Sequence, residues 1–110
     1  MVRGRVVSQE AAEAALRSRL EVLQARSRGE LAALPEWSSE DTVVDGLPSR
    51  ITTYREQGDG GRLRIVLQLI SNEKPFLVVF RSRQVFVEGF EILPDAGIRA
   101  LGQDEMYAYN

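Results

Sequence analysis

Apolar residues are concentrated between residues 62 and 93 of the chain, where they recur at alternate positions along short runs. A period of two residues is typical of β-strands, in which successive side chains point to opposite faces of a sheet. Turn residues separate these runs, so we predict an antiparallel meander of four to five strands within residues 50–101. The predicted strands cover residues 50–57, 62–70, 76–81, 84–93 and 98–101.

Before this region the apolar residues follow the helical period instead. They fall within one wedge of a helix about 100° wide, and they are Ala12, Leu16, Leu20, Leu23, Leu31 and Leu34. Ser27 and Glu30 have the spacing of a capping box, which marks the start of a helix. Pro35 ends the pattern. We therefore predict a helical region over residues 8–34 that kinks or restarts near Gly29.

The predicted strand over residues 76–81 is apolar on both of its faces. Such strands lie in the middle of a sheet that is covered on both sides. One helical layer covers one face only, so the second face needs the C-terminal segment, the loop at residues 36–49, or another subunit. We take a homodimer as the leading hypothesis among these alternatives. A short helix over residues 103–109 completes the predicted α+β domain, in which the N-terminal helix packs on the meander.

Asp59 and Gly60 form the strongest hairpin signal in the chain. A two-residue turn at this point places Arg55 opposite Arg64 on the neighbouring strand, with Arg62 on the same face. Like charges directly opposite each other are destabilising, so this cluster has two interpretations. Either nearby acidic residues or acids of the C-terminal tail neutralise it, or the three arginines bind an anion or the acidic surface of a partner.

Trp37 lies in an otherwise polar segment at residues 36–49, in which Val43 and Val44 indicate at most a short strand. We expect this segment to be a loop that Trp37 anchors to the core. In the other interpretation, Trp37 is a stacking partner for a ligand. Gly89 interrupts the predicted strand over residues 84–93, and glycine within a strand suggests a bulge or a bend.

The composition limits the chemistry more strongly than any motif does. The chain has 110 residues, which argues for a single domain over residues 1–110. It contains no Cys and no His, which excludes disulfides, thiolate zinc sites, cysteine nucleophiles and the usual proton shuttle at neutral pH. We predict no cofactor and no metal. No run approaches the ~20 apolar residues of a membrane span, and the chain begins without a secretory signal, so we expect a cytoplasmic protein that does not contact a membrane.

The formal net charge of −2, and the lack of a basic stripe with interleaved aromatic residues, argue against nucleic acid as a partner. We predict a small soluble protein-interaction module, such as an adaptor, an inhibitor or an immunity-type partner, that self-associates or binds another protein. The alternative is a small-ligand-binding domain, or an enzyme that works without His and Cys, with a pocket between helix and sheet. The pocket candidates are Trp37, Tyr54, Arg64 and Glu88.

Overall fold

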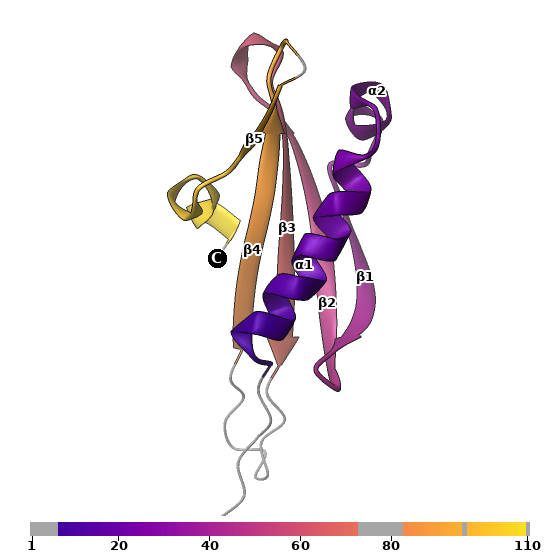
Figure 1. Ribbon diagram of the computed structural model, residues 1–110, viewed down its shortest axis with the longest axis vertical. Coiled ribbons are helices and arrows are strands. Elements are labelled where there is room, and N and C mark those ends of the chain that lie inside the picture. Colours follow the sequence, from indigo (N-terminus) through magenta and orange to yellow (C-terminus); the bar gives the residue numbers. More distant parts are fainter. Residues whose placement is uncertain (1–6, 73–82, 96, 110) are drawn as a thin grey trace, which may run out of the picture.

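The computed structural model describes residues 7–72, 83–95 and 97–109. Within them, two helices cover one side of a five-stranded antiparallel sheet, and a short 3-10 helix follows the last strand (Figure 1). The elements are α1 (Gln9–Gln24), α2 (Arg28–Ala32), β1 (Trp37–Val44), β2 (Leu47–Gln57), η1 (Asp59–Gly61), β3 (Leu63–Asn72), β4 (Arg83–Ile92), β5 (Ile98–Ala100) and η2 (Gln103–Tyr109). The predicted α+β architecture, with its short C-terminal helix, is confirmed.

The helical region starts, and later restarts, at a serine cap. The Ser8 hydroxyl accepts a hydrogen bond from the backbone N–H of Ala11 at 3.1 Å. Ser27 begins α2 through a complete capping box: its hydroxyl accepts from the Glu30 N–H, and the Glu30 carboxylate accepts from the Ser27 N–H, both at 3.2 Å. The predicted restart is confirmed, but the break lies at residues 25–27, because the chain must leave the helical conformation before the cap can form.

The strands follow one another in the sheet in the order β1-β2-β3-β4-β5, so the described strands form a meander as predicted. The prediction of a loop over residues 36–49 is wrong. This segment contains β1 and the start of β2, joined by a turn in which Asp45 and Gly46 have φ of 54° and 77°. β1 is the edge of the sheet and most of its side chains are exposed. Such a strand buries too little apolar surface to show the alternation by which strands are recognised in a sequence.

The β2–β3 hairpin has a register one residue away from the predicted one. Glu56, and not Arg55, lies opposite Arg64. The reason is one additional residue in the turn, which closes through a hydrogen bond from the Gly58 N–H to the Arg62 carbonyl at 2.9 Å and contains η1. A slip of one residue sends the side chains of a strand to the other face of the sheet, so Arg55 and Arg64 lie on opposite faces.

β3 and β4 pair directly with each other along their whole length, from Leu63 opposite Ile92 to Asn72 opposite Arg83. The predicted strand over residues 76–81 lies outside the described residues, and its predicted place between these two strands is wrong. In the described part of the chain, the middle of the sheet is formed by β2, β3 and β4.

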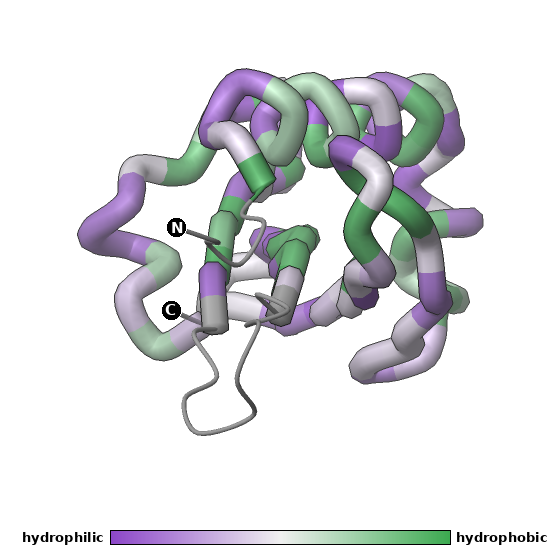
Figure 2. Tube along the Cα trace, turned by 90° about the horizontal axis from the view of Figure 1, so that it is seen from below, coloured by the Kyte–Doolittle hydropathy of each residue, from purple (hydrophilic) through white to green (hydrophobic). Residues whose placement is uncertain are grey.

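The side of the sheet that faces α1 and α2, here called the helix face, carries the larger core. In the end-on view of Figure 2, the helical layer lies above the strands. The alternation along the strands and the helical period bring the apolar side chains of both layers together. The buried residues of this core are Val7, Ala12, Leu16, Leu23, Leu31, Val44, Leu47, Ile51, Leu63, Ile65, Leu67, Leu69, Phe90 and Ile92.

The other side of the sheet, here called the second face, is partly covered by the C-terminal segment. Buried valines of β3 and β4 pack there against Leu101 and Met106. Gly89 makes the close approach possible, because a Cβ at this position would lie 2.6 Å from the carbonyl oxygen of Ile65 and 3.1 Å from the Met106 sulfur. The strand keeps its regular pairing at Gly89, so the predicted bulge is wrong. The C-terminal segment, one of the predicted alternatives, is thus a cover of the second face.

Candidate interaction groove beside the edge strand

The residues that the sequence nominates for a site lie in three separate regions. The first region is an ion network on the second face, and it includes Arg62 and Arg64. The second is a hollow beside α1 that contains Glu88. The third is a groove at the start of β1, lined in part by Trp37, Tyr54 and Arg55.

Glu91 is the centre of the ion network. Its side chain is only 3% exposed, and its two oxygens lie 3.1 Å from Nη2 of Arg64 and 3.3 Å from Nη2 of Arg99. Arg62 is more distant, at 3.9 Å, and Glu105 of η2 accepts hydrogen bonds from Arg99 at 2.7 and 2.9 Å. Burial alone would raise the pKa of Glu91, but the hydrogen bonds from Arg64 and Arg99 outweigh it, and the pKa is lowered.

The network neutralises most of the arginine charge on this face. The guanidinium groups of Arg62, Arg64 and Arg99 face the carboxylates of Glu91 and Glu105. Glu105 belongs to the C-terminal tail. One interpretation of the arginine cluster is that acids of this tail neutralise it, and Glu105 does so for Arg64 and Arg99. Because these contacts join β3 and β4 to β5 and η2, the network holds the C-terminal segment on the sheet.

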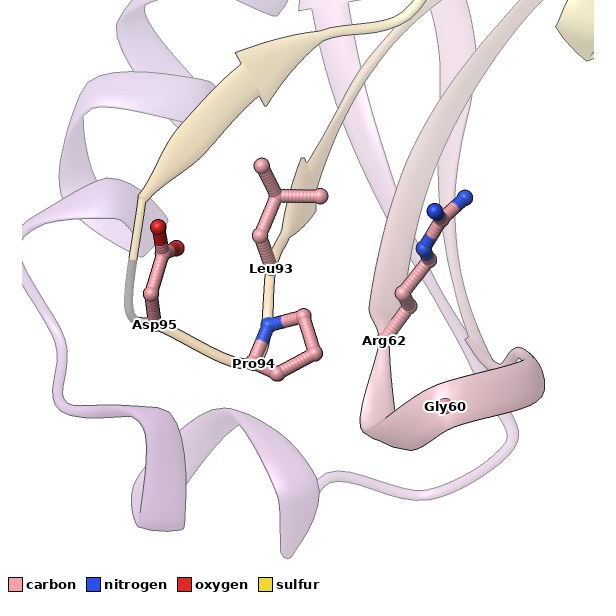
Figure 3. A pocket seen from close by; sticks show the side chains of 5 residues that line it. All are labelled: Gly60, Arg62, Leu93, Pro94 and Asp95. Atoms are coloured by element: carbon pink, nitrogen blue, oxygen red, sulfur yellow. The ribbon is translucent and has the colours of Figure 1, made fainter.

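An open hollow of about 660 Å³ lies beside Arg62, between the β2–β3 turn and the β4–β5 turn (Figure 3). Gly60, Leu93, Pro94 and Asp95 form the rest of its lining. Arg62 and Asp95 stand on opposite sides of the hollow and carry opposite charges. The lining therefore has no surplus positive charge, and anion binding by Arg62 stays a prediction.

Glu88 lies between helix and sheet, where the alternative function places its pocket. The hollow there has a volume of about 340 Å³. It is lined by Gln9, Glu13, Leu16, Val85, Phe86, Val87, Glu88 and Gln103. Burial, and then the negative charge of Glu13, raise the pKa of Glu88, whereas Arg17 acts in the other direction. The other nominated pocket residues do not line this hollow.

The third region is a groove of about 760 Å³ at the start of β1. Its lining comes from α2, β1, β2, η2 and the residue before β1, and it consists of Ala32, Glu36, Trp37, Tyr54, Arg55, Glu56, Gln57 and Tyr109. Trp37 and Tyr54 lie opposite each other in the β1–β2 pair, which brings two of the nominated residues together. The expectation that Trp37 anchors its segment to the core is wrong, because 64% of its surface is exposed.

Tyr109 adds a third aromatic ring to the groove, and only its place in an aromatic C-terminal segment signals this in the sequence. Its ring centre lies 4.8 Å from that of Tyr54, with 47° between the ring planes. The Tyr54 hydroxyl donates to Gln68 Oε1 at 3.1 Å, and Gln68 Nε2 donates to the Tyr109 carbonyl at 2.5 Å. The Tyr109 hydroxyl donates to the Glu56 carboxylate. Burial and this bond raise the pKa of Tyr109, so the hydroxyl remains a donor.

Three charged side chains, those of Glu36, Arg55 and Glu56, line the groove. Arg55 Nε donates to the carbonyl of Leu34 at 2.7 Å, which fixes the guanidinium against the end of the helical region. The Arg55 backbone N–H donates to the carbonyl of Glu36 at 2.8 Å. Glu36 and Glu56 each add a carboxylate to the lining. Two negative groups therefore accompany one positive group in this groove.

β1 continues from the groove along the edge of the sheet. Among the described strands, only β2 pairs with it. The hydrogen bond from the Arg55 N–H to the Glu36 carbonyl shows that residues 36 and 55 form a hydrogen-bonded pair. Hydrogen-bonded and non-hydrogen-bonded pairs alternate along an antiparallel ladder, so this bond fixes which residues of β1 bond to β2. The even-numbered residues of 38–44 direct their N–H and C=O groups to β2. The N–H and C=O groups of Ser39, Asp41 and Val43 point outward.

The middle of β1 is acidic. Glu40 forms an ion pair with Arg19 of α1, and Asp41 pairs with Arg50 of β2 at 3.1 Å. The Glu40 and Asp41 side chains are 48% and 80% exposed. Exposed ion pairs contribute only about 0–1 kcal/mol, so both carboxylates can exchange their arginine for another cation at little cost.

In the described ranges, none of the helices has the length and apolar character needed to cross a membrane. The same residues contain no group of three or more potential ligands placed to hold a metal ion. Comparison with protein-family models, with curated protein sequences and with solved structures gives no match.

Proposed function

We propose that the protein is an interaction module that adds an extended, basic segment of a partner protein to its sheet along β1. In such strand addition, main-chain hydrogen bonds supply affinity, and side chains at alternate positions supply specificity. A role as an adaptor, an inhibitor or an immunity-type partner in the cytoplasm fits this activity. The observation that carries the proposal is the exposed, acidic edge of an eight-residue strand that ends in an aromatic groove.

The length of β1 favours it over the other edge of the sheet. β1 has eight residues, whereas β5 has three and pairs only with residues 90–92 of β4. Beside β5, the carbonyls of Gly89 and Val87 on the β4 edge already accept hydrogen bonds from the Leu101 N–H and from Gln103 Nε2. An unpaired strand edge is a template for pairing with another chain, and short edge strands limit such pairing. The outward groups of Ser39, Asp41 and Val43 offer hydrogen bonds to an incoming strand. The proposed partner segment therefore lies along β1.

The charge of β1 supports a basic partner segment. Glu40 and Asp41 lie next to each other in the middle of the strand, and Glu36 precedes it. An incoming strand places its own side chains directly beside these carboxylates. Opposite charges at facing positions contribute about 0.2–1 kcal/mol per pair, and like charges are destabilising. Because Glu40 and Asp41 point to opposite faces of the sheet, Arg or Lys at the two consecutive partner positions that face them is the matching pattern.

The same charges argue against a second copy of the chain on this edge. Two copies of β1 would pair antiparallel about a twofold axis. In the registers that use nearly all of the strand, Glu40 would face Glu40 of the second copy, or Asp41 would face Asp41 of the second copy. A homodimer through another surface stays a prediction, and light scattering at micromolar concentration tests it. A monomer mass of 12.3 kDa would contradict a homodimer.

The alternative function, a ligand-binding domain or an enzyme with a pocket between helix and sheet, is supported by the groove, which contains its candidates Trp37 and Tyr54, but that groove lies at the edge of the sheet. The hollow beside α1 is its other support. The hollow beside α1 brings Glu13 and Glu88 together, and the pKa of Glu88 is raised. Its volume of about 340 Å³ is at the lower end of the range for ligand pockets, which is about 300–1,000 Å³. We therefore favour the interaction module.

A proline at the edge tests strand addition. Val43→Pro removes one outward N–H and leaves the β1–β2 hydrogen bonds intact, while Val43→Ala removes the side chain and keeps the N–H. Displayed random peptides of about ten residues, selected on the wild-type chain, should be rich in Arg or Lys at two consecutive positions. They should bind the proline variant about tenfold more weakly than the alanine variant. Equal binding by the two variants, or selection of acidic peptides, would contradict the proposal.

A further inference from the structure

We infer that the groove beside Trp37 is a site for the cationic side chain of an arginine or lysine of the partner. The groove lies at the N-terminal end of β1, where one end of an added strand would reach it. The inference therefore rests on the proposed function for the identity of the partner. The chemistry of the groove itself can be tested without the partner.

The aromatic rings provide the first argument. Trp37, Tyr54 and Tyr109 all line the groove, and the two tyrosine rings are 4.8 Å apart. A guanidinium or ammonium group is attracted to the face of such a ring when it lies within about 6 Å of the ring centre. Because 64% of the Trp37 surface is exposed, its indole is available to a ligand.

The charge of the lining provides the second argument. Glu36 and Glu56 face one guanidinium, that of Arg55, so the groove carries one net negative charge. Arg55 is already engaged by the carbonyl of Leu34, and Glu56 by the hydroxyl of Tyr109. Glu36 is exposed. A cation placed over Trp37 would find a carboxylate nearby and would bring the charge of the groove to zero.

The same features argue against other ligands for the groove. A phosphate or a carboxylate would meet the two glutamates, and like charges repel at this range. An uncharged apolar side chain could stack on the rings, but it would leave the negative charge uncompensated. Aromatic rings beside acidic groups thus favour an organic cation.

Trp37 is the only tryptophan of the chain, so its fluorescence reports on the groove directly. The probes are N-acetyl-arginine amide, N-acetyl-lysine amide and N-acetyl-citrulline amide, the last being a neutral analogue of the first. We expect a saturable change of Trp37 emission with the two cationic probes. Citrulline amide should bind at least about threefold more weakly, because it lacks the charge.

Two variants locate the site. Glu36→Gln removes a carboxylate of the groove and keeps its size, so it should weaken binding of the arginine probe about threefold. Glu21→Gln removes an exposed carboxylate of α1 outside the groove and should leave binding unchanged. Equal binding of arginine and citrulline amides, the absence of a saturable response, or equal effects of the two variants would overturn the inference.

The outcome is separable from that of strand addition. Val43→Pro should leave binding of the arginine probe unchanged, because residue 43 is not part of the groove lining. If the probe binds as expected but the selected peptides bind Val43→Pro and Val43→Ala equally, the cation site stands and strand addition fails. If the peptides distinguish those variants but the probes do not respond, strand addition stands and the cation site fails.

Discussion

Glu56 lies directly opposite Arg64 on the neighbouring strand of the β2–β3 hairpin. This pairing separates the arginines that a two-residue turn would have stacked on one another. Arg55 extends toward the end of the helical region on the helix face, whereas Arg64 reaches Glu91 on the second face. One additional turn residue thus divides the predicted arginine cluster. Arg55 lines the groove, whereas Arg62 and Arg64 belong to the ion network.

Replacing Gly61 tests the turn that sets this register. Gly61 has φ of 80°, a conformation that other residues adopt only with strain. We expect Gly61→Ala to lower the free energy of unfolding by about 1 kcal/mol, measured by denaturant titration. Gly58→Ala is the control, because φ is −97° at Gly58 and its new Cβ would be 3.6 Å from the nearest atom. A loss in the control as large as that in Gly61→Ala would contradict this account of the turn.

Replacing Gly89 tests the close contact between this position of β4 and the backbone of β3. In Gly89→Ala the new Cβ would overlap the carbonyl oxygen of Ile65 at 2.6 Å, and this backbone atom cannot move without disturbing β3. We expect a loss of about 1–3 kcal/mol in the free energy of unfolding. Gly29→Ala, at an open helical position where the nearest atom would be 4.0 Å away, should instead gain about 0.5–1 kcal/mol. A Gly89→Ala variant as stable as the wild type would show that the close contact does not exist.

Glu91 should be the most sensitive charged residue for stability. Glu91→Ala removes the buried carboxylate that Arg64 and Arg99 share, but both partly exposed guanidinium groups keep Glu105 as a partner, so we expect a loss of about 1–3 kcal/mol in the free energy of unfolding. Chemical denaturation measures this loss. Glu21→Ala, on the exposed side of α1, should change stability by no more than about 0.5 kcal/mol. Similar small effects of both substitutions would contradict the central place of Glu91.

Acid should weaken the same network. Hydrogen bonds from Arg99, and then from the Gly102 N–H, lower the pKa of Glu105 to about 2. In the unfolded chain its pKa is about 4.3, so the unfolded state takes up the proton first as the pH falls. The stabilisation is complete above the unfolded pKa and is lost between about pH 4.5 and pH 2. Unfolding midpoints are measured at a series of pH values for the wild type and for Glu105→Gln. The midpoint of Glu105→Gln should fall less as the pH is lowered, and an equal fall in both proteins would contradict this role.

The elements with strong periodic patterns were predictable from the sequence. The helical region, the alternation of β3 and the turn glycines depend on local chemistry, which the chain displays directly. The capping box at Ser27 and Glu30 is the clearest case, because both of its hydrogen bonds lie within four consecutive residues. Such features do not depend on how distant segments pack.

The rest depended on tertiary contacts. β1 escaped prediction because an exposed edge strand needs few apolar residues. The hairpin register depended on whether Gly61 adopts a positive φ, which the pattern Asp59-Gly60 does not specify. The groove joins Trp37 to Tyr109, two residues far apart in the sequence, through the packing of η2 on the sheet. Trp37 and Tyr54 were nominated separately, and the β1–β2 pairing brings them together.

Amide hydrogen exchange along β1 tests strand addition most directly. It is measured residue by residue by nuclear magnetic resonance, for the free chain and for the chain with a selected basic peptide. The account predicts that the outward amides of Ser39, Asp41 and Val43 exchange quickly in the free chain and slow markedly when the peptide binds, while the amides directed to β2 change little. A bound peptide that leaves these three amides exchanging as fast as before would contradict it.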